Sequence, residues 1–237
     1  MTQLSFTVSS PDGAARTLEL GFDTLVIAGW AGRDAAAIQH HIDELAALGV
    51  APPSSTPCFY RVAAQQLSQA DTVEVLGTDT SGEIECVLFG SPLGTLVTIG
   101  SDHTDRKTEA YSVAVSKQVC VKPVAREAWR YAEVAAHWDR LELRARLVAA
   151  DGSARTYQQG SVDGLLPPAT LWQRHGGIDI DIEALPAGSA MYSGTLAVLG
   201  EMAAMKSGDA FELELHDPVL GRSLRHLYAV QALPVVA

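Results

Sequence analysis

Three acidic side chains are the residues of this sequence best suited to do chemistry. Glu83 and Glu85 lie two positions apart in the apolar run GEIECVLF, and Asp102 follows in IGSDHTDR. On a β-strand, residues two apart point to the same side, so the two glutamates would hold like charges side by side. A divalent cation removes this repulsion, and about three carboxylates with open positions for water or substrate suit magnesium or manganese. The three residues therefore predict a metal site, although the same spacing is also common on strands with one solvated face.

Composition limits the kinds of partner that such a site serves. The chain has 237 residues, of which 47% are hydrophobic and 19% are charged, as in folded globular proteins. The formal net charge of −11 repels phosphate backbones, and no basic, aromatic-rich stretch offsets it, so we expect no nucleic-acid partner. No apolar run approaches the ~20 residues that cross a bilayer, and the N-terminus does not resemble a signal peptide. We therefore expect a soluble, cytoplasmic protein that does not bind membranes.

A mostly β chain must position the acidic residues. Segments rich in β-branched and aromatic residues and bounded by turn residues are predicted to be strands. They are 4–8, 17–20, 24–29, 58–62, 72–77, 83–90, 95–102, 140–150, 154–160, 189–196, 210–217 and 223–233. The clearest helix begins after Asp34 as N-cap, ends at Gly49 and carries His41 and Glu44 on its polar face. A second helix, near 162–175, is interrupted by two prolines.

This order of elements predicts a β-rich α+β fold. No repeat and no long linker divides the chain. We expect one compact catalytic domain over residues 24–237, preceded by a short N-terminal β appendage over residues 1–23.

Several stretches, taken in order, resemble the motifs of the fumarylacetoacetate hydrolase superfamily. They are LVIAG, His41 to Glu44, the proline loop 52–57, Phe59-Tyr60-Arg61, Glu83 to Gly90, Ser101 to Lys107, Lys117 to Pro123, Ser193 to Gly200 and Gly208 to Glu214. The resemblance covers the chain from about residue 24 to about residue 231. The chain also resembles, more closely, a bacterial branch of uncharacterised proteins, a domain of unknown function, that carries GSDHTDRKxEAYSVAVSKQ and HDPVLGR. The resemblance implies a mixed β-roll or sandwich of the fumarylacetoacetate hydrolase-like kind, with short peripheral helices.

The superfamily resemblance also implies how the acidic residues would act. Glu83, Glu85 and Asp102 would ligate Mg2+ or Mn2+, and the ion would chelate a 1,3-dicarbonyl or 2-oxo acid and stabilise its enolate. Lys117 would add a second positive charge beside the developing carbanion or oxyanion. Without the resemblance, Lys117 would be interpreted as a solvated surface lysine.

Further roles follow for residues around the expected metal. His41 and Glu44 would form the pair that activates water, on a helix that acts as a mobile lid in related enzymes. Spacing alone would favour an ordinary polar helix face, and His40 competes with His41 because the preceding segment is longer than in the family pattern. Thr195 and Arg61 would bind the substrate carboxylate, and Arg106 would join them or support the metal ligands.

Departures from the family pattern bear on the substrate rather than on the metal. Ser101 replaces the asparagine before the metal aspartate, Lys107 replaces the closing aspartate, and Arg61 stands where the family often has lysine. The resemblance therefore implies a divalent-metal-dependent hydrolase or decarboxylase that acts on a small β-dicarbonyl or 2-oxo acid through an enolate. Related enzymes are usually homodimers, so we expect a homodimer with a small-molecule carboxylate substrate.

Three alternatives remain open at this point. A hydratase or isomerase would use the same metal site and the same enolate. A non-catalytic metabolite-binding or assembly module would use the carboxylates only for structure. A serine or cysteine hydrolase is the weakest alternative, because the chain has no GxSxG motif and none of Cys58, Cys86 and Cys120 has an activating histidine near it in sequence. The cysteines also form no CxxC pair, so we expect neither a disulfide framework nor a zinc ribbon.

Overall fold

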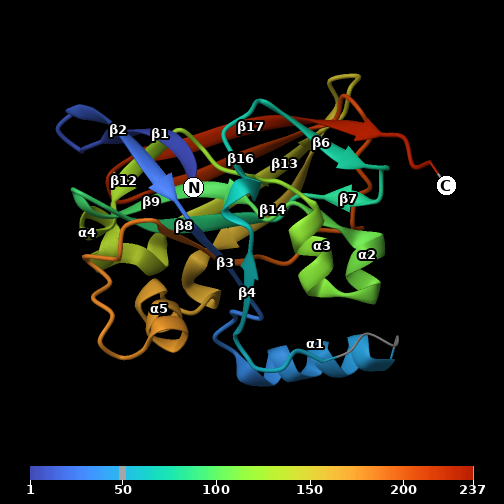
Figure 1. The fold of residues 1–237 in the computed structure, drawn as a ribbon, viewed down its shortest axis with the longest axis horizontal. Helices are drawn as coiled ribbons and strands as arrows, with labels where there is room; N and C mark the ends of the chain where they lie inside the picture. Colours follow the sequence, from blue (N-terminus) through green and yellow to red (C-terminus); the bar gives the residue numbers. More distant parts are fainter. Residues whose placement is uncertain (48–51, 237) are drawn as a thin grey trace.

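The computed structural model describes residues 1–47 and 52–236, except for the side chains of residues 41, 44, 45 and 47. Figure 1 shows the strands in the upper part of the molecule and helices α1 and α5 below them. The longer strands are β1 Thr2–Ser9, β2 Ala15–Phe22, β3 Thr24–Gly29, β4 Cys58–Val62, β6 Thr72–Leu76, β8 Ile84–Ser91, β9 Gly94–Ser101, β12 Glu127–Arg130, β13 Glu142–Val148, β14 Ala154–Ser161, β15 Ser189–Thr195, β16 Ala210–Asp217 and β17 Arg222–Leu233. Four two-residue strands are β5 Leu67–Ser68, β7 Thr80–Ser81, β10 Thr104–Asp105 and β11 Lys122–Pro123.

Short helices connect and flank these strands. They are α1 Ala35–Ala47, α2 Arg106–Tyr111, α3 Val113–Val119, α4 Tyr131–Val134 and α5 Pro168–Gly176, with 3-10 turns at Ala64–Gln66, Ala135–Arg140 and Val162–Gly164. Helix α1 begins as predicted, because the Asp34 carboxylate accepts hydrogen bonds from the N–H groups of Ala36 and Ala37 at 2.9 and 3.1 Å. The predicted helix end at Gly49 lies outside the described residues. Pro168 occupies the first turn of α5, so the prolines begin this helix instead of interrupting a longer one.

Two sheets build the body of the protein. The larger sheet has the strand order β2-β1-β12-β9-β8-β15-β3-β4, and the smaller has the order β14-β13-β16-β17-β6. Buried residues of both sheets, among them Leu88, Val97 and Leu213, form one hydrophobic cluster, and a second cluster with Phe6 and Phe89 covers the other face of the larger sheet. Strand β8 is therefore buried on both faces, which explains its nearly continuous apolar sequence.

The first two strands are part of the larger sheet. Strand β1 pairs with β2 over its whole length and with β12 in parallel, and the rings of Phe6 and Phe89 lie 4.6 Å apart. The proposed division into an appendage of residues 1–23 and a domain of residues 24–237 stays a prediction.

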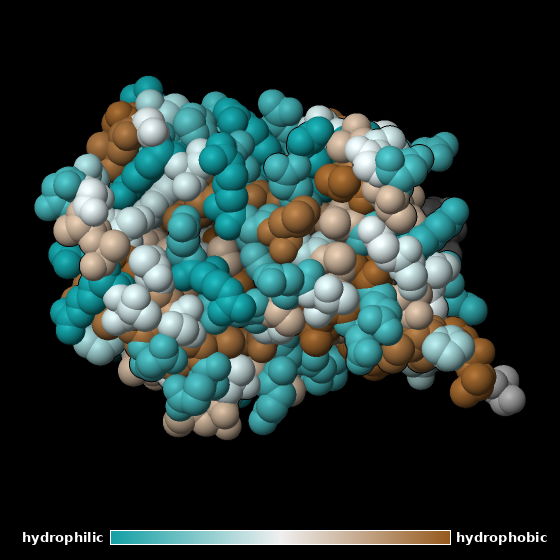
Figure 2. All heavy atoms as spheres, turned by 90° about the horizontal axis from the view of Figure 1, so that it is seen from above, coloured by the Kyte–Doolittle hydropathy of each residue, from teal (hydrophilic) through white to brown (hydrophobic). Residues whose placement is uncertain are grey.

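One face of the smaller sheet is exposed to solvent. Strand β16 alternates buried and half-buried residues, and its outward glutamates form ion pairs with neighbouring strands, as in Arg144–Glu214 and Arg146–Glu212, both at 3.0 Å. Figure 2, seen from above Figure 1, shows mainly hydrophilic residues with small, scattered hydrophobic groups. Among the described residues, no helix combines the length and the apolar composition that a membrane crossing requires.

Candidate metal centre

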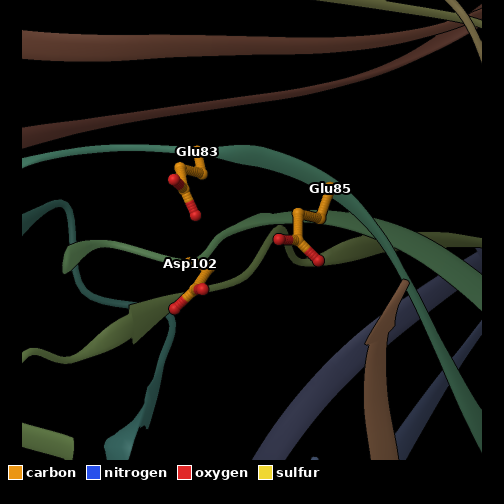
Figure 3. Close-up of side chains that lie close together, drawn as sticks. All are labelled: Glu83, Glu85 and Asp102. Atoms are coloured by element: carbon orange, nitrogen blue, oxygen red, sulfur yellow. The ribbon is translucent and has the colours of Figure 1, made fainter. Parts of the chain in front are cut away.

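Strands β8 and β9 bring the three predicted carboxylates together. Glu83 precedes β8, Glu85 lies on β8, and Asp102 follows the last residue of β9. The antiparallel register sets Ile84 opposite Ser101, and the N–H of Asp102 donates to the carbonyl of Glu83 at 2.9 Å. One carboxylate oxygen from each acidic residue lies within 4.8 Å of the other two, and Figure 3 shows the side chains turned toward a common space.

Burial differs among the three carboxylates. The Glu83 side chain is 17% exposed, whereas Glu85 is 2% exposed and Asp102 is fully buried. The alternative interpretation, a strand with one solvated face, does not fit Glu85, because only Glu83 is partly exposed and the other two carboxylates are buried.

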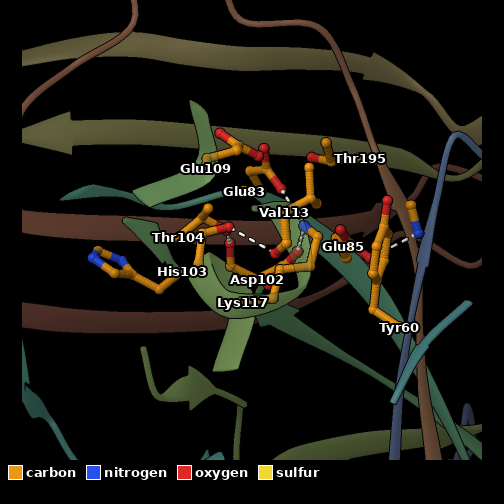
Figure 4. Close-up of polar contacts among 12 residues, drawn as sticks. Tyr60, Glu83, Glu85, Asp102, His103, Thr104, Glu109, Val113, Lys117 and Thr195 are labelled. Atoms are coloured by element: carbon orange, nitrogen blue, oxygen red, sulfur yellow. Dashed lines mark hydrogen bonds and ion pairs between the residues drawn. The ribbon is translucent and has the colours of Figure 1, made fainter. Parts of the chain in front are cut away.

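Three cationic side chains surround this carboxylate cluster. Arg106 donates to Glu83 and to Glu109, each at 2.9 Å. The Lys117 ammonium forms an ion pair with Asp102 and lies 3.7 Å from Glu83 (Figure 4). Lys122, which is fully buried, lies 3.1 Å from Asp102 on its other oxygen. Lys117 thus occupies a position between two of the three carboxylates.

Burial and these cations set the charges of the cluster. Burial acts to raise the pKa of Asp102, but Lys117 and Lys122 outweigh it and lower this pKa to about 2. Burial likewise opposes the charge of Lys117, yet Asp102 and Glu83 raise the pKa of its ammonium above the ordinary value. For Glu85, burial and then the charges of Asp102 and Glu83 raise the pKa well above its usual range. Glu85 is the carboxylate whose charge is least compensated.

The donor set suits a hard divalent cation. All three groups offer oxygen atoms, and among the described residues Glu85 accepts one hydrogen bond, from the N–H of Gly194 at 2.7 Å. One oxygen of Asp102 also receives no hydrogen bond from the described residues, although the Lys122 ammonium is near it. A cation bound here would relieve an excess of negative charge that the protein itself balances only in part.

A network behind the carboxylates holds their backbone. Ser101 Oγ accepts from the N–H of Glu83 at 3.2 Å and from the Tyr228 hydroxyl at 2.9 Å. His103 contacts the same hydroxyl at 2.8 Å, and Lys122 donates to the His103 carbonyl at 2.6 Å. Burial, and next the charge of Lys122, lower the pKa of the His103 ring to about 3, so this ring is neutral. His103 supports the loop from behind and is not exposed to a ligand.

Thr195 lies beside the cluster, but its hydroxyl is used inside the protein. It donates to the Ile84 carbonyl at 2.8 Å and accepts from the Gln158 amide at 2.8 Å. Gln158 in turn accepts from the N–H of Ile84 at 3.0 Å and is fully buried. Gly194 has φ +90°, and a Cβ there would lie 2.8 Å from the Cβ of Ala31, so this turn requires glycine. The strand carrying Glu85 is thus fixed on both sides.

Arg61 is placed differently from the sequence-based expectation. It is exposed, and its guanidinium donates to the backbone carbonyls of Asp23, Leu25 and Val62 at 2.7, 3.2 and 2.6 Å. Among the described residues, no hydrogen bond or ion pair joins it to the carboxylates. Its neighbour Tyr60 projects toward Lys117 instead, because successive strand residues point to opposite faces. The substrate-binding role of Arg61 stays a prediction.

The side chains of His41 and Glu44 lie outside the described part of the structure, so their predicted role as a water-activating pair also stays a prediction. Sequence reasoning did not assign roles to Lys122, Gln158 and Tyr60. Lys122 follows the matched motif lysine closely, but nothing in its spacing signals that it reaches Asp102. Gln158 and Tyr60 carry no local signal, because strand pairing alone brings them to the cluster.

Comparison with known proteins places this geometry in context. The model of the family described as "Protein of unknown function (DUF2848)" matches residues 28–228. A comparison with curated proteins finds no match. The chain is similar to the solved structure titled "Crystal structures of Cg1458", with a TM-score of 0.62 and 16% identity over 96% of this chain and 88% of that chain. It is also similar to a 2-keto-3-deoxy-D-arabinonate dehydratase complexed with magnesium and 2,5-dioxopentanoate, with a TM-score of 0.59 and 16% identity over 90% of this chain and 74% of that one.

The apo form of that dehydratase is similar as well, with a TM-score of 0.61 and 16% identity over 92% of this chain and 77% of the other. At this level of identity the likeness concerns the fold. It confirms the β-rich α+β fold of the fumarylacetoacetate hydrolase-like kind that the sequence motifs predicted.

Proposed function

This chain belongs to the DUF2848 family, and from that premise we propose that it is a divalent-metal-dependent enzyme that forms an enolate from a small 2-oxo acid or β-dicarbonyl compound. The observation that carries the proposal is the convergence of Glu83, Glu85 and Asp102 within 4.8 Å in a largely buried place. We propose these three residues as the ligands of Mg2+ or Mn2+. Membership of the wider fumarylacetoacetate hydrolase superfamily is part of the proposal, supported by the fold and by the ordered motifs.

The charge balance of the cluster favours a dianionic reaction intermediate. Four carboxylates, Glu83, Glu85, Asp102 and the Glu109 that Arg106 also contacts, face three cations, so the formal charge of the site is −1; the cations are Arg106, Lys117 and Lys122. A divalent ion would leave an excess of one positive charge. The enolate of a 2-oxo carboxylate carries two negative charges, one on the carboxylate and one on the enolate oxygen. A positively charged site attracts this intermediate more strongly than it attracts the singly charged substrate, which is the condition for catalysis.

When bound, the ion supplies Lewis-acid polarisation of the substrate carbonyl. Lys117 stands between Asp102 and Glu83 and would release part of its pairing to hold an oxygen of the substrate. Lys122 and Arg106 would be positioning residues, since each pairs with one of the proposed ligand carboxylates. His41 is our candidate for the water-activating base, with Glu44 orienting its ring.

The bond that breaks after enolate formation distinguishes several reactions. Hydrolysis of a carbon–carbon bond and decarboxylation are the reactions that the sequence motifs imply. Elimination of water uses the same enolate, and the magnesium-complexed dehydratase with a similar fold supports including it. We propose this group of reactions, in a homodimer, with a small carboxylate as substrate.

Hydrogen exchange at carbon tests enolate formation whichever bond breaks later. A panel of 2-oxo acids, including pyruvate and oxaloacetate, is incubated in D2O with the protein and Mg2+ or Mn2+, and the C3 proton signals are followed by NMR. We expect ion-dependent loss of the C3 signal for at least one acid, abolished by EDTA and by Glu85→Gln. Glu74→Gln, which changes an exposed strand glutamate, is the matched control and should exchange at the wild-type rate.

Thermal unfolding of the same proteins separates binding from chemistry. A native-state ion site raises the melting temperature as the ion concentration increases. Exchange that persists in EDTA contradicts the proposed role of the metal. Absence of any stabilisation by Mg2+ or Mn2+ contradicts the metal site itself. A non-catalytic metabolite-binding or assembly module would then be the better interpretation.

A further inference from the structure

An aromatic pair beside the carboxylate cluster has no role in the proposed function so far. Tyr60 on β4 places its ring 5.7 Å from the Lys117 ammonium, and the indole N–H of Trp30 donates to the Tyr60 hydroxyl at 3.3 Å. Both side chains are half-buried. Figure 4 draws Tyr60 together with Lys117 and the carboxylates. The pair therefore borders the space in which the substrate of the proposed enzyme would lie.

The backbone at Gly29 and Trp30 allows the two rings to lie together. Trp30 has φ +57°, in the left-handed region that bulky residues rarely adopt and that costs about 1 kcal/mol or more. Gly29 precedes it, and a Cβ at this position would come within 2.8 Å of the Tyr60 ring. Strain of this kind is common where a site is preorganised.

The hydrogen bond from Trp30 leaves the phenol as a donor. The indole N–H occupies one lone pair of the hydroxyl oxygen, and the phenol proton lies near the Cys58 sulfur, a weak acceptor that a charged ligand oxygen would displace. The ring face contacts the Lys117 ammonium, which restricts this flexible side chain through a cation–π interaction. Tyr60 thus offers a flat apolar face and a directed O–H group next to a fixed positive charge. A planar, oxygen-rich anion is the ligand that uses all three.

We propose that Tyr60 is a substrate-binding residue, whose hydroxyl, held by Trp30, donates a hydrogen bond to an oxygen of the planar 2-oxo acid bound at the carboxylate cluster. This inference rests on the proposed function. It selects substrates whose reactive part is flat, such as an enolate or a conjugated dicarbonyl, over branched ones. It also gives the strand motif Phe59-Tyr60-Arg61 a different contact residue from the arginine that the sequence suggested.

Oxalate, a planar dianion that mimics an enolate, is the probe. Calorimetric titration first measures Mn2+ binding to the wild type and to Tyr60→Phe, and then oxalate binding to each Mn2+-loaded protein. Tyr60→Phe keeps the ring and its contact with Lys117 but removes the donor. Tyr111→Phe removes a hydroxyl from a tyrosine that is 87% exposed on α2 and serves as the matched control.

We expect equal Mn2+ affinity in all three proteins and an oxalate affinity about tenfold lower in Tyr60→Phe, as for one lost hydrogen bond to a charged oxygen. Trp30→Phe, which removes only the indole donor, should weaken oxalate in the same direction by a smaller factor. Tyr60→Phe and Trp30→Phe should each retain the wild-type Mn2+ affinity. Retained Mn2+ affinity shows that a loss of oxalate affinity does not come from misfolding.

The outcomes separate the inference from the function beneath it. Wild-type Mn2+ binding with equal oxalate affinity in Tyr60→Phe and wild type overturns the role of Tyr60 and leaves the metal enzyme standing. A wild-type protein that binds no Mn2+ overturns both. Weakened oxalate binding in Tyr111→Phe as well would show a general effect on the fold and would also overturn the inference.

Discussion

Neutralising two buried carboxylates of the same cluster should have opposite consequences for the folded protein. Asp102→Asn removes the partner of Lys117 and Lys122, which are 5% and 0% exposed. Glu85→Gln removes a carboxylate that receives one backbone hydrogen bond and sits near two like charges. Both changes should abolish metal binding, but only the first leaves buried charges without compensation.

The sizes of the two effects follow from these contacts. Removing one member of a buried ion pair costs about 3 to 5 kcal/mol. In a chain of this size each kcal/mol lowers the melting temperature by about 2 to 4 °C, so Asp102→Asn should melt about 10 °C below the wild type. The amide of Glu85→Gln still accepts from Gly194 and no longer repels Asp102, so its melting temperature without metal should stay within about 2 °C of the wild type or rise.

Thermal unfolding in EDTA and in Mn2+ measures both effects. With the ion at about 100 times its dissociation constant, the wild type should gain about 2.7 kcal/mol, or about 5 to 10 °C, and neither variant should gain any. Equal destabilisation of the two variants in EDTA would refute our view that Asp102 is compensated and Glu85 is not. Ion-dependent stabilisation of Glu85→Gln as large as that of the wild type would remove Glu85 from the ligand set.

Two further predictions concern residues away from the opening of the site. Gln158→Leu leaves the N–H of Ile84 without its hydrogen-bond partner, so urea unfolding in EDTA should show a free energy of unfolding lower by about 2 to 4 kcal/mol. Metal affinity should also fall, because Ile84 lies between two of the proposed ligands. A variant as stable as the wild type would contradict this prediction. Burial acts to raise the pKa of Asp217, but the N–H of Leu220 and the His137 ring lower it. Its contribution should be complete above pH ~4 and lost as the pH falls through the lowered value, so the stability advantage of the wild type over Asp217→Asn should be full at pH 7 and should decrease as the pH falls below ~4. A difference that is independent of pH would argue against it.

Local patterns in the sequence predicted most of the elements. Alternating and apolar runs gave strands close to the observed bounds of β3, β15 and β16, because side-chain direction on a strand depends on neighbouring residues only. Asp34 marked the start of α1 through hydrogen bonds to residues two and three positions away. The acidic residues and their order along the chain were visible for the same reason. The ordered motifs then identified the fold, which the solved structures of similar fold support.

The surroundings of the carboxylates depended on contacts between distant segments. The pairing of β8 with both β9 and β15 buries Glu85 and supplies the N–H of Gly194, 109 residues away. Lys122 reaches Asp102 because the segment after α3 returns to the end of β9, where Val124 forms a β-bridge with Gly100. Tyr60 and not Arg61 lies near Lys117 because the two side chains project from opposite faces of β4. A sequence specifies residue types and local periodicity. Burial, charge compensation and the direction in which each side chain points are set by strand register across the whole sheet, and that register is a property of the packed molecule.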